Sequence, residues 1–196
     1  LRARSVIKAT GTWADRLRHE VNPETRVRPL RGSHLVLARE RLPVQDCLTI
    51  FHPRDKRPVF AFPWEGATVI GTTDLDHRQD PDAEATISTD ELDYLLEAVN
   101  DQFPQHAIGR ADIISTWSGV RPVIGSDRSK DPSKERRNHA VWVDKGLVTV
   151  TGGKLTTFRK IALDAIEAAT GTLGKLSIVE PGEAVFANTS ISAAAI

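Results

Sequence analysis

The segment Val148-Thr-Val-Thr-Gly-Gly-Lys-Leu-Thr-Thr-Phe-Arg159 decides the fold of the C-terminal part of this chain. Its apolar start predicts a strand, Gly152 and Gly153 favour a turn, and a helical pattern follows Lys154. A glycine turn at a helix N-terminus gathers backbone N–H groups and the helix dipole at one point, which suits negative charge. We therefore expect an anionic group beside Lys154; a solvent-exposed lysine after a glycine turn is the alternative interpretation.

The elements around this segment follow from the same patterns. Strands over 140–143 and 147–151, joined by Asp144-Lys-Gly146, predict a tight hairpin. The last helix is expected from about Lys154 to Thr170, with Gly171 as its C-terminal stop. Its inward positions are expected to be Leu155, Phe158, Ile161, Ala165, Ile166 and Ala169.

The preceding part of the chain predicts one helix and many short strands. Ser88-Thr-Asp-Glu91 is a capping-box signature, and apolar residues at helical spacing predict a helix over 89–103 with a solvated acidic face: Asp90, Glu91, Asp93 and Glu97. Strand-like runs separated by Pro, Gly or charged turns predict a largely antiparallel sheet between Arg26 and Asp74. These runs are His34–Ala38, Cys47–Phe51, Pro58–Phe62 and Thr68–Gly71, and a further strand is expected over Ile113–Trp117.

The N-terminal residues and the aromatic residues support further expectations. Ser5–Gly11 predicts a strand, and Thr12 is a candidate cap for a short helix through Leu17. The aromatic side chains, Trp64 and Trp142 among them, are expected to be mostly in the core. A charged loop is expected over 127–138.

Composition describes an ordinary globular protein. Of the 196 residues, 40% are hydrophobic, and 26 basic residues balance 26 acidic ones, so bulk charge predicts no nucleic-acid partner. A single cysteine, Cys47, excludes an internal disulfide. The histidines are scattered, so no metal site is expected, and no apolar run reaches the roughly 18 residues of a spanning helix.

Five segments in a fixed order carry a more specific signal. They are Ala9-Thr-Gly-Thr-Trp-Ala-Asp15, Arg31-Gly-Ser-His-Leu-Val36, Ile70-Gly-Thr-Thr-Asp74, Trp117-Ser-Gly-Val-Arg-Pro122 and the segment quoted first. Together they resemble the FAD-dependent glycerol-3-phosphate dehydrogenases of the D-amino-acid-oxidase-like flavoprotein superfamily. The resemblance implies oxidation of sn-glycerol 3-phosphate to dihydroxyacetone phosphate with hydride transfer to FAD, and electrons passed to quinone, or to oxygen in the oxidase branch.

The resemblance also implies an α/β architecture in several parts. Residues 1–30 and 117–172 are expected to belong to a Rossmann-like FAD-binding domain, and residues 31–116 to a substrate-binding domain with a mostly antiparallel sheet. Residues 173–196 are expected to link to a further domain. Gly-x-Gly-x-x-Gly is absent, as is any methionine, so we expect a C-terminal piece that neither binds FAD tightly nor turns over alone.

The family resemblance assigns roles to four residues. His34 is the candidate general base, since an ordinary histidine pKa lies near neutrality. Arg121, between a glycine and a proline, is expected to be directed by a backbone turn and to bind the substrate anion, and Lys154 to stabilise reduced flavin. Arg137 is the second candidate anion ligand, with Arg136 left open. Without the resemblance, a structural histidine and a surface arginine are the alternatives.

Cofactor contacts are implied at both ends of the chain. The candidates are Thr10, Gly11, Gly152, Gly153, Lys154, Leu155, Thr156 and Thr157. The segment 71–74 is expected to be architectural, with no step of the reaction assigned to it.

Partners and location follow from the family alone. The resemblance implies a cytoplasmic enzyme bound peripherally to the inner face of the membrane, with quinone as electron acceptor, and leaves a homodimer open. A flavin oxidase of amino acids, or a non-catalytic module derived from a flavoenzyme, are the alternative functions.

Overall fold

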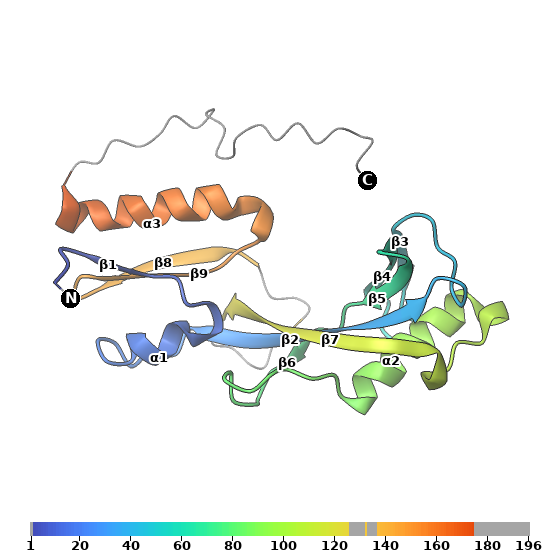
Figure 1. The fold of residues 1–196 in the computed structure, drawn as a ribbon. Coiled ribbons are helices and arrows are strands. Elements are labelled where there is room, and N and C mark those ends of the chain that lie inside the picture. The colour runs from blue at the N-terminus through green and yellow to red at the C-terminus, as the bar shows by residue number, and fades with distance from the viewer. Residues whose placement is uncertain (1, 126–131, 133–136, 175–196) are drawn as a thin grey trace, which may run out of the picture.

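The computed structural model describes residues 2–125, 132 and 137–174, and its helices and strands form two sheets with helices packed on them (Figure 1). The larger sheet has the order β3-β4-β5-β2-β6, with β7 also paired to β2, and every pairing is antiparallel. Its strands are β2 (Val27–Ala38), β3 (Leu48–Phe51), β4 (Pro58–Trp64), β5 (Ala67–Gly71), β6 (Leu75–Asp76) and β7 (Ile113–Ile124). The predicted antiparallel sheet is confirmed.

The smaller sheet has the order β1-β9-β8. Its strands are β1 (Val6–Lys8), β8 (His139–Asp144) and β9 (Leu147–Gly152). The predicted hairpin is confirmed, since β8 and β9 are antiparallel, while β1 runs parallel to β9. Helices α1 (Ala14–Arg18) and α3 (Phe158–Leu173) lie on opposite sides of this sheet (Figure 1). The short 3-10 turns η1 (Gly11–Trp13) and η5 (Leu155–Thr157) lead into the two helices.

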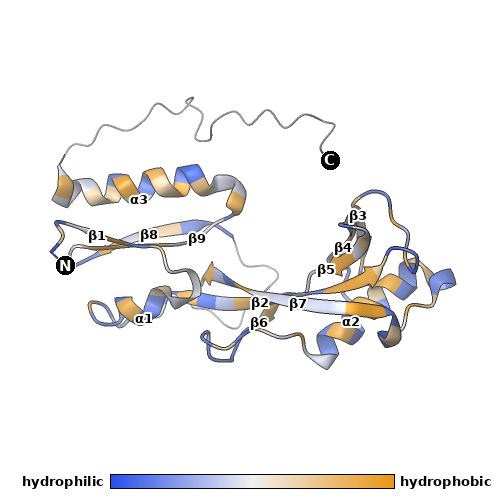
Figure 2. Cartoon of the chain, in the orientation of Figure 1, coloured by the Kyte–Doolittle hydropathy of each residue, from blue (hydrophilic) through white to orange (hydrophobic). Residues whose placement is uncertain are grey.

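The main core lies between one face of the larger sheet and α2 (Thr89–Gln102). Leu35 and Leu37 of β2 point toward this helix and are fully buried. Because side chains alternate along a strand, Gly32 and His34 lie on the opposite face. In Figure 2 the hydrophobic colour of β2 and β7 lies toward both ends of the strands, whereas their middle is pale. That polar middle carries the candidate site.

Helix α2 begins with the predicted capping box, because Ser88 and Glu91 bond each other's backbone N–H groups. The expectation of a fully solvated acidic face is wrong at one residue: Glu91 is 2% exposed. Asp90 and Asp93 are exposed, as expected. Glu91 differs because hydroxyl groups and one arginine of the sheet surround it.

Three further local predictions are corrected. Thr12 lies inside η1 and does not cap α1, whose N-cap is Trp13. Gly171 does not end the last helix; α3 continues to Leu173, and Gly174 takes the C-terminal position with a φ of 80°. Arg121 lies within β7 and not in a turn, so strand pairing directs its side chain.

The expectations for buried aromatic and apolar side chains are wrong at several positions. Trp64 is 63% exposed, Phe158 44% and Leu155 88%. Alternation in β4 places Trp64 on the face away from α2, and Leu155 lies in the turn before α3. The helical spacing alone did not show which face a neighbouring element covers.

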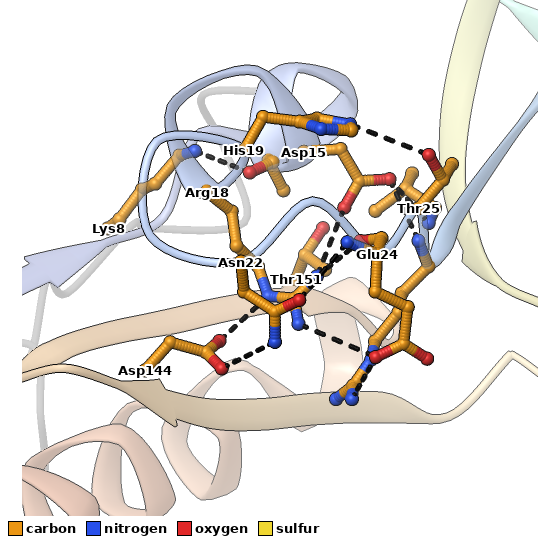
Figure 3. A network of polar contacts seen from close by, with 12 residues as sticks. Lys8, Asp15, Arg18, His19, Asn22, Glu24, Thr25, Asp144 and Thr151 are labelled. Carbon is orange, nitrogen blue, oxygen red and sulfur yellow. Dashed lines mark hydrogen bonds and ion pairs between the residues drawn. The ribbon is translucent and has the colours of Figure 1, made fainter.

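A polar network connects α1 and the loop after it to the hairpin β8–β9 (Figure 3). Arg18 is fully buried and donates from Nε to Asp144 Oδ2 at 2.8 Å. Asn22 donates to the other oxygen of Asp144 at 2.8 Å, and the Arg18 guanidinium lies 5.1 Å from the ring centre of Trp142. The network holds η1 and its glycine beside the smaller sheet.

Candidate active site

His34 lies in the middle of β2, paired with Gly71 of β5 on one side and Trp117 of β7 on the other. Its ring stacks on Trp117, with centroids 3.7 Å apart and planes at 7°. A Cβ at Gly71 would come within 2.2 Å of Cδ2 of His34. Gly71 is therefore required by the space that the imidazole fills.

Burial and, to a smaller extent, the nearby positive charge of Arg121 together lower the pKa of His34 to about 4. The ring is neutral at physiological pH for this reason. Its Nδ1 is buried and has no hydrogen-bond partner among the residues that the structure describes. A neutral imidazole can accept a proton, as the predicted role of His34 requires.

Arg121 of β7 shares the sheet face of His34. The pairings Leu30–Arg121, Gly32–Gly119 and His34–Trp117 are every second pair of one antiparallel ladder, so these side chains lie on one side. A Cβ at Gly32 would come within 2.3 Å of an Arg121 guanidinium nitrogen. The glycine before Ser33 thus makes room for the arginine.

Two polar residues of the segment after β5 accept hydrogen bonds from the Arg121 guanidinium. It donates to the Thr72 hydroxyl at 3.1 Å and to Asp74 at 3.3 Å. Arg137 donates to the second oxygen of Asp74 at 3.1 Å. The predicted anion ligands are therefore neighbours, although sixteen positions separate them in the sequence. Arg136 lies outside the described residues.

A cavity of about 360 Å³ lies beside these arginines. Among its lining residues are Arg121, Arg137, Gly153 and Lys154. The structure thus brings together three of the four residues with predicted roles. His34 is adjacent to Arg121 on the sheet but does not line this cavity.

The predicted cofactor residues form two neighbouring segments. Thr151 at the end of β9 donates to the carbonyl of Gly11 at 3.2 Å, which holds the Thr10–Gly11 turn near the Gly152–Gly153 turn. Gly11, Gly152 and Gly153 have φ values of 57°, 78° and 84°, which favour glycine. A Cβ at Gly152 or Gly153 would also strike the protein itself, at Asn138 and Ile161. Internal packing and backbone conformation therefore already explain why glycine stands at positions 152 and 153.

The turn that opens α3 fits an anionic or hydrogen-bond-accepting group. Lys154, Leu155, Thr156 and Thr157 are exposed, and the first N–H groups of a helix have no intrahelical acceptor. Lys154 adds a cation at the same place and lines the cavity with two arginines. These donors suit the edge of a flavin that gains negative charge on reduction.

The sequence indicated Glu91 only as a helix-capping and surface residue and Asp74 only as part of an architectural segment, and it missed the central position of both in the polar contacts. Glu91 accepts hydrogen bonds from Arg31 at 2.6 Å, from the Ser33 hydroxyl at 2.8 Å and from the Thr73 hydroxyl at 2.6 Å. Burial alone would raise the pKa of Glu91, but hydrogen bonds from Thr73, Ser88, Arg31 and Ser33 outweigh it and lower the pKa. One sequence signal was available for Glu91. Arg31 and Ser33 lie four and two residues before the core residue Leu35, so alternation along the strand places them on the same face, which α2 covers.

Comparison with known proteins identifies the class. The profile described as "FAD dependent oxidoreductase" matches residues 1–159. The chain belongs to this family of FAD-dependent oxidoreductases, which confirms the predicted superfamily and its cofactor class.

Particular relatives share one name. The aerobic glycerol-3-phosphate dehydrogenase of Staphylococcus haemolyticus is 37% identical over 170 residues, which are 85% of this chain and 30% of that protein. The enzyme of the same name from Bacillus subtilis is 37% identical over 163 residues, or 82% of this chain and 29% of that protein. The chain thus spans about a third of the length of these curated relatives.

A solved structure supports the fold assignment. The glycerol-3-phosphate dehydrogenase of Bacillus halodurans, complexed with FAD, superposes with a TM-score of 0.76 and is 31% identical. The match covers 88% of this chain and 33% of that one. The predicted α/β fold class is confirmed.

Proposed function

We propose that this chain forms the substrate sheet and a cofactor-contacting segment of an FAD-dependent glycerol-3-phosphate dehydrogenase. The observation that carries the proposal is the convergence of Arg121, Arg137 and Lys154 on one cavity. Two guanidinium groups suit a phosphate, because each can donate two parallel hydrogen bonds to its oxygens. The relatives named aerobic glycerol-3-phosphate dehydrogenase support the same substrate.

In this proposal each residue has a separate task. Arg121 and Arg137 bind the substrate phosphate and orient the carbon chain. His34 takes the proton of the hydroxyl that is oxidised; because Nδ1 is buried, the substrate meets the ring at Nε2. A pKa of about 4 keeps the His34 ring unprotonated at neutral pH, and it also makes the imidazole a weaker base than an ordinary histidine, whose pKa of 6.5 lies nearer the operating pH.

The cofactor contacts are proposed at the two glycine turns. Bound FAD supplies the hydride acceptor. Lys154 and the backbone N–H groups of Leu155 and Thr156 stabilise negative charge at that position, and Thr10 with Gly11 contributes a second contact. The Thr157 N–H already donates to the Lys154 carbonyl at 3.0 Å, so the predicted contact of Thr157 would need that bond to open. The division into cofactor residues 1–30 and 117–172 and substrate residues 31–116 stays a prediction; its boundary at 117 falls within β7. The predicted linker over 173–196 lies almost wholly outside the described residues.

The electron acceptor and location belong to the same proposal. We place the whole enzyme in the cytoplasm, bound peripherally to the inner face of the membrane, with quinone as acceptor. Among the described residues, no helix has the length and apolar character needed to cross a membrane.

Ligand titration of the 196-residue chain tests the substrate. Nitrogen-15 NMR of the arginine side chains would follow Arg121 and Arg137 during addition of sn-glycerol 3-phosphate, glycerol or glycine. We expect saturable shifts at both arginines with the phosphate ester, and none with glycerol. Shifts with glycine alone would support an amino-acid oxidase and contradict the proposal.

A flavin measurement tests the cofactor. The chain is incubated with FAD, purified, and treated with glycerol 3-phosphate without oxygen. We expect little bound flavin, because the chain lacks Gly-x-Gly-x-x-Gly. Stoichiometric flavin that bleaches would show a complete active site and contradict the expectation of an incomplete one.

A further inference from the structure

Asp74 lies at the centre of an arginine cluster that the roles proposed above do not explain. Its side chain is 3% exposed and follows the strand β5 in the segment Gly71-Thr-Thr-Asp74. Arg121 and Arg137 contact its two oxygens at 3.3 and 3.1 Å. A third guanidinium, that of Arg57, lies 3.9 Å from it.

The three arginines come from distant parts of the chain. Arg57 directly precedes β4, Arg121 is in β7, and Arg137 precedes β8. Three positive charges and one negative charge leave an excess of two, so the cluster still attracts an anion. Without a carboxylate between them, the guanidinium groups would repel one another and the flexible side chains would separate.

Asp74 is itself held firmly. The neighbouring Thr73 hydroxyl accepts from the Ser33 N–H at 2.9 Å and donates to Glu91 at 2.6 Å. Thr72 accepts from Arg121 at 3.1 Å. The segment is thereby fixed to β2 and to α2, and it presents the carboxylate at a defined position.

We propose that Asp74 is a positioning residue of the substrate-anion site: it holds Arg121 and Arg137 at the spacing that one phosphate group requires, with Arg57 as the third member of the cluster. The proposal rests on the function proposed above and adds the residue that organises its anion site. In this proposal Asp74 does not touch the substrate phosphate, because two anions repel each other and each Asp74 oxygen faces an arginine instead.

Asp74 could affect anion binding through its negative charge or by positioning the arginines. These two explanations predict opposite effects of one substitution on the affinity for anions, which makes the proposal testable. Asp74→Asn keeps the shape of the side chain and raises the local charge by one. If Asp74 acts only as a competing negative charge, anions bind more tightly to the variant. If Asp74 positions the arginines, the variant binds them about tenfold more weakly despite its higher charge.

Two measurements on the 196-residue chain separate these outcomes. The first is the affinity for inorganic phosphate and for sn-glycerol 3-phosphate, by calorimetry or NMR. The second is the nitrogen-15 order of the Arg121 and Arg137 side chains without ligand. We expect weaker binding and greater arginine mobility in Asp74→Asn, and partial rescue of both in Asp74→Glu.

Asp76→Asn is the matched control. Asp76 is two residues further along and pairs with the buried Arg28 at 2.7 Å, so its loss also removes a buried ion pair. Among the described residues, the cluster of Arg57, Arg121 and Arg137 is joined through Asp74 and not through Asp76. We expect it to reduce the melting temperature without weakening phosphate binding.

The two proposals fail in different ways. Unchanged arginine order in Asp74→Asn, or tighter phosphate binding, would overturn the role of Asp74 while leaving the substrate assignment intact. Ordered arginines in the original chain that bind neither phosphate nor the phosphate ester would overturn the substrate assignment. Loss of arginine order in Asp74→Asn would still support the positioning role in that case.

Discussion

The imidazole of His34 lies flat on the indole of Trp117, with ring centroids 3.7 Å apart and an angle of 7° between the planes. The two residues are partners in the β2–β7 ladder, so the backbone pairing fixes the stack. Trp117 is itself 50% exposed. The stack therefore covers the histidine and leaves the tryptophan in contact with solvent.

Removal of this cover should raise the pKa of His34. Burial is the largest cause of its low value of about 4, so Trp117→Ala should move the pKa up toward the ordinary value of 6.5. An NMR titration of the His34 ring between pH 3 and 8 measures the change. A pKa that stays near 4 in Trp117→Ala would mean that other neighbours bury the ring.

Loss of the nearby positive charge should have a smaller effect in the same direction. Arg121 is the second cause of the low pKa, so Arg121→Gln should raise the pKa of His34 by less than Trp117→Ala does. A folded-state pKa below the ordinary value contributes stability above about pH 6.5, and this is lost as the pH falls toward 4. The Arg121→Gln protein should lose less stability over that interval, as urea unfolding at several pH values would show.

Gly71→Ala should destabilise the protein by about 2 kcal/mol, because the new methyl group overlaps the His34 ring. The ring cannot move aside freely, since Trp117 stacks on it. Gly119→Ala is the matched control: Gly119 also lies in the sheet, and a Cβ there would meet nothing within 4 Å. We expect the control to change the free energy of unfolding by less than about 0.5 kcal/mol. Equal effects of the two substitutions would contradict the steric explanation.

Glu91→Gln should destabilise the protein by about 3 kcal/mol at pH 7, because Arg31 would lose its buried partner. Asp93→Asn, which breaks the exposed pair with Arg110, should cost no more than about 1 kcal/mol. Chemical unfolding measures both values.

The stabilisation that ionised Glu91 contributes should decrease as the pH falls. Its folded-state pKa lies below the ordinary value of 4.5, so its contribution is complete above that pH and is lost as the pH falls through the lower value. The difference between the original protein and Glu91→Gln should therefore shrink below pH 4.5. A constant difference down to pH 2 would refute this account.

Local patterns predicted the elements that depend on neighbours in the sequence. The Ser88–Glu91 capping box and the β8–β9 hairpin follow from turn and cap chemistry within a few residues, and both are confirmed. The order of five motifs likewise indicated the family without any knowledge of contacts. These features need no information about distant parts of the chain.

The tertiary structure alone decided which side chains meet. Glu91 reads as one more surface acid on α2, and Asp74 as part of an architectural turn, until β2 and β7 place an arginine beside each. Spacing along the chain cannot show this, because a strand register brings together residues such as His34 and Trp117 that are far apart in sequence. The sequence by itself therefore determined the family, the local elements and the types of the reactive residues. The register of the long strands and the burial of two carboxylates decided how those residues are arranged.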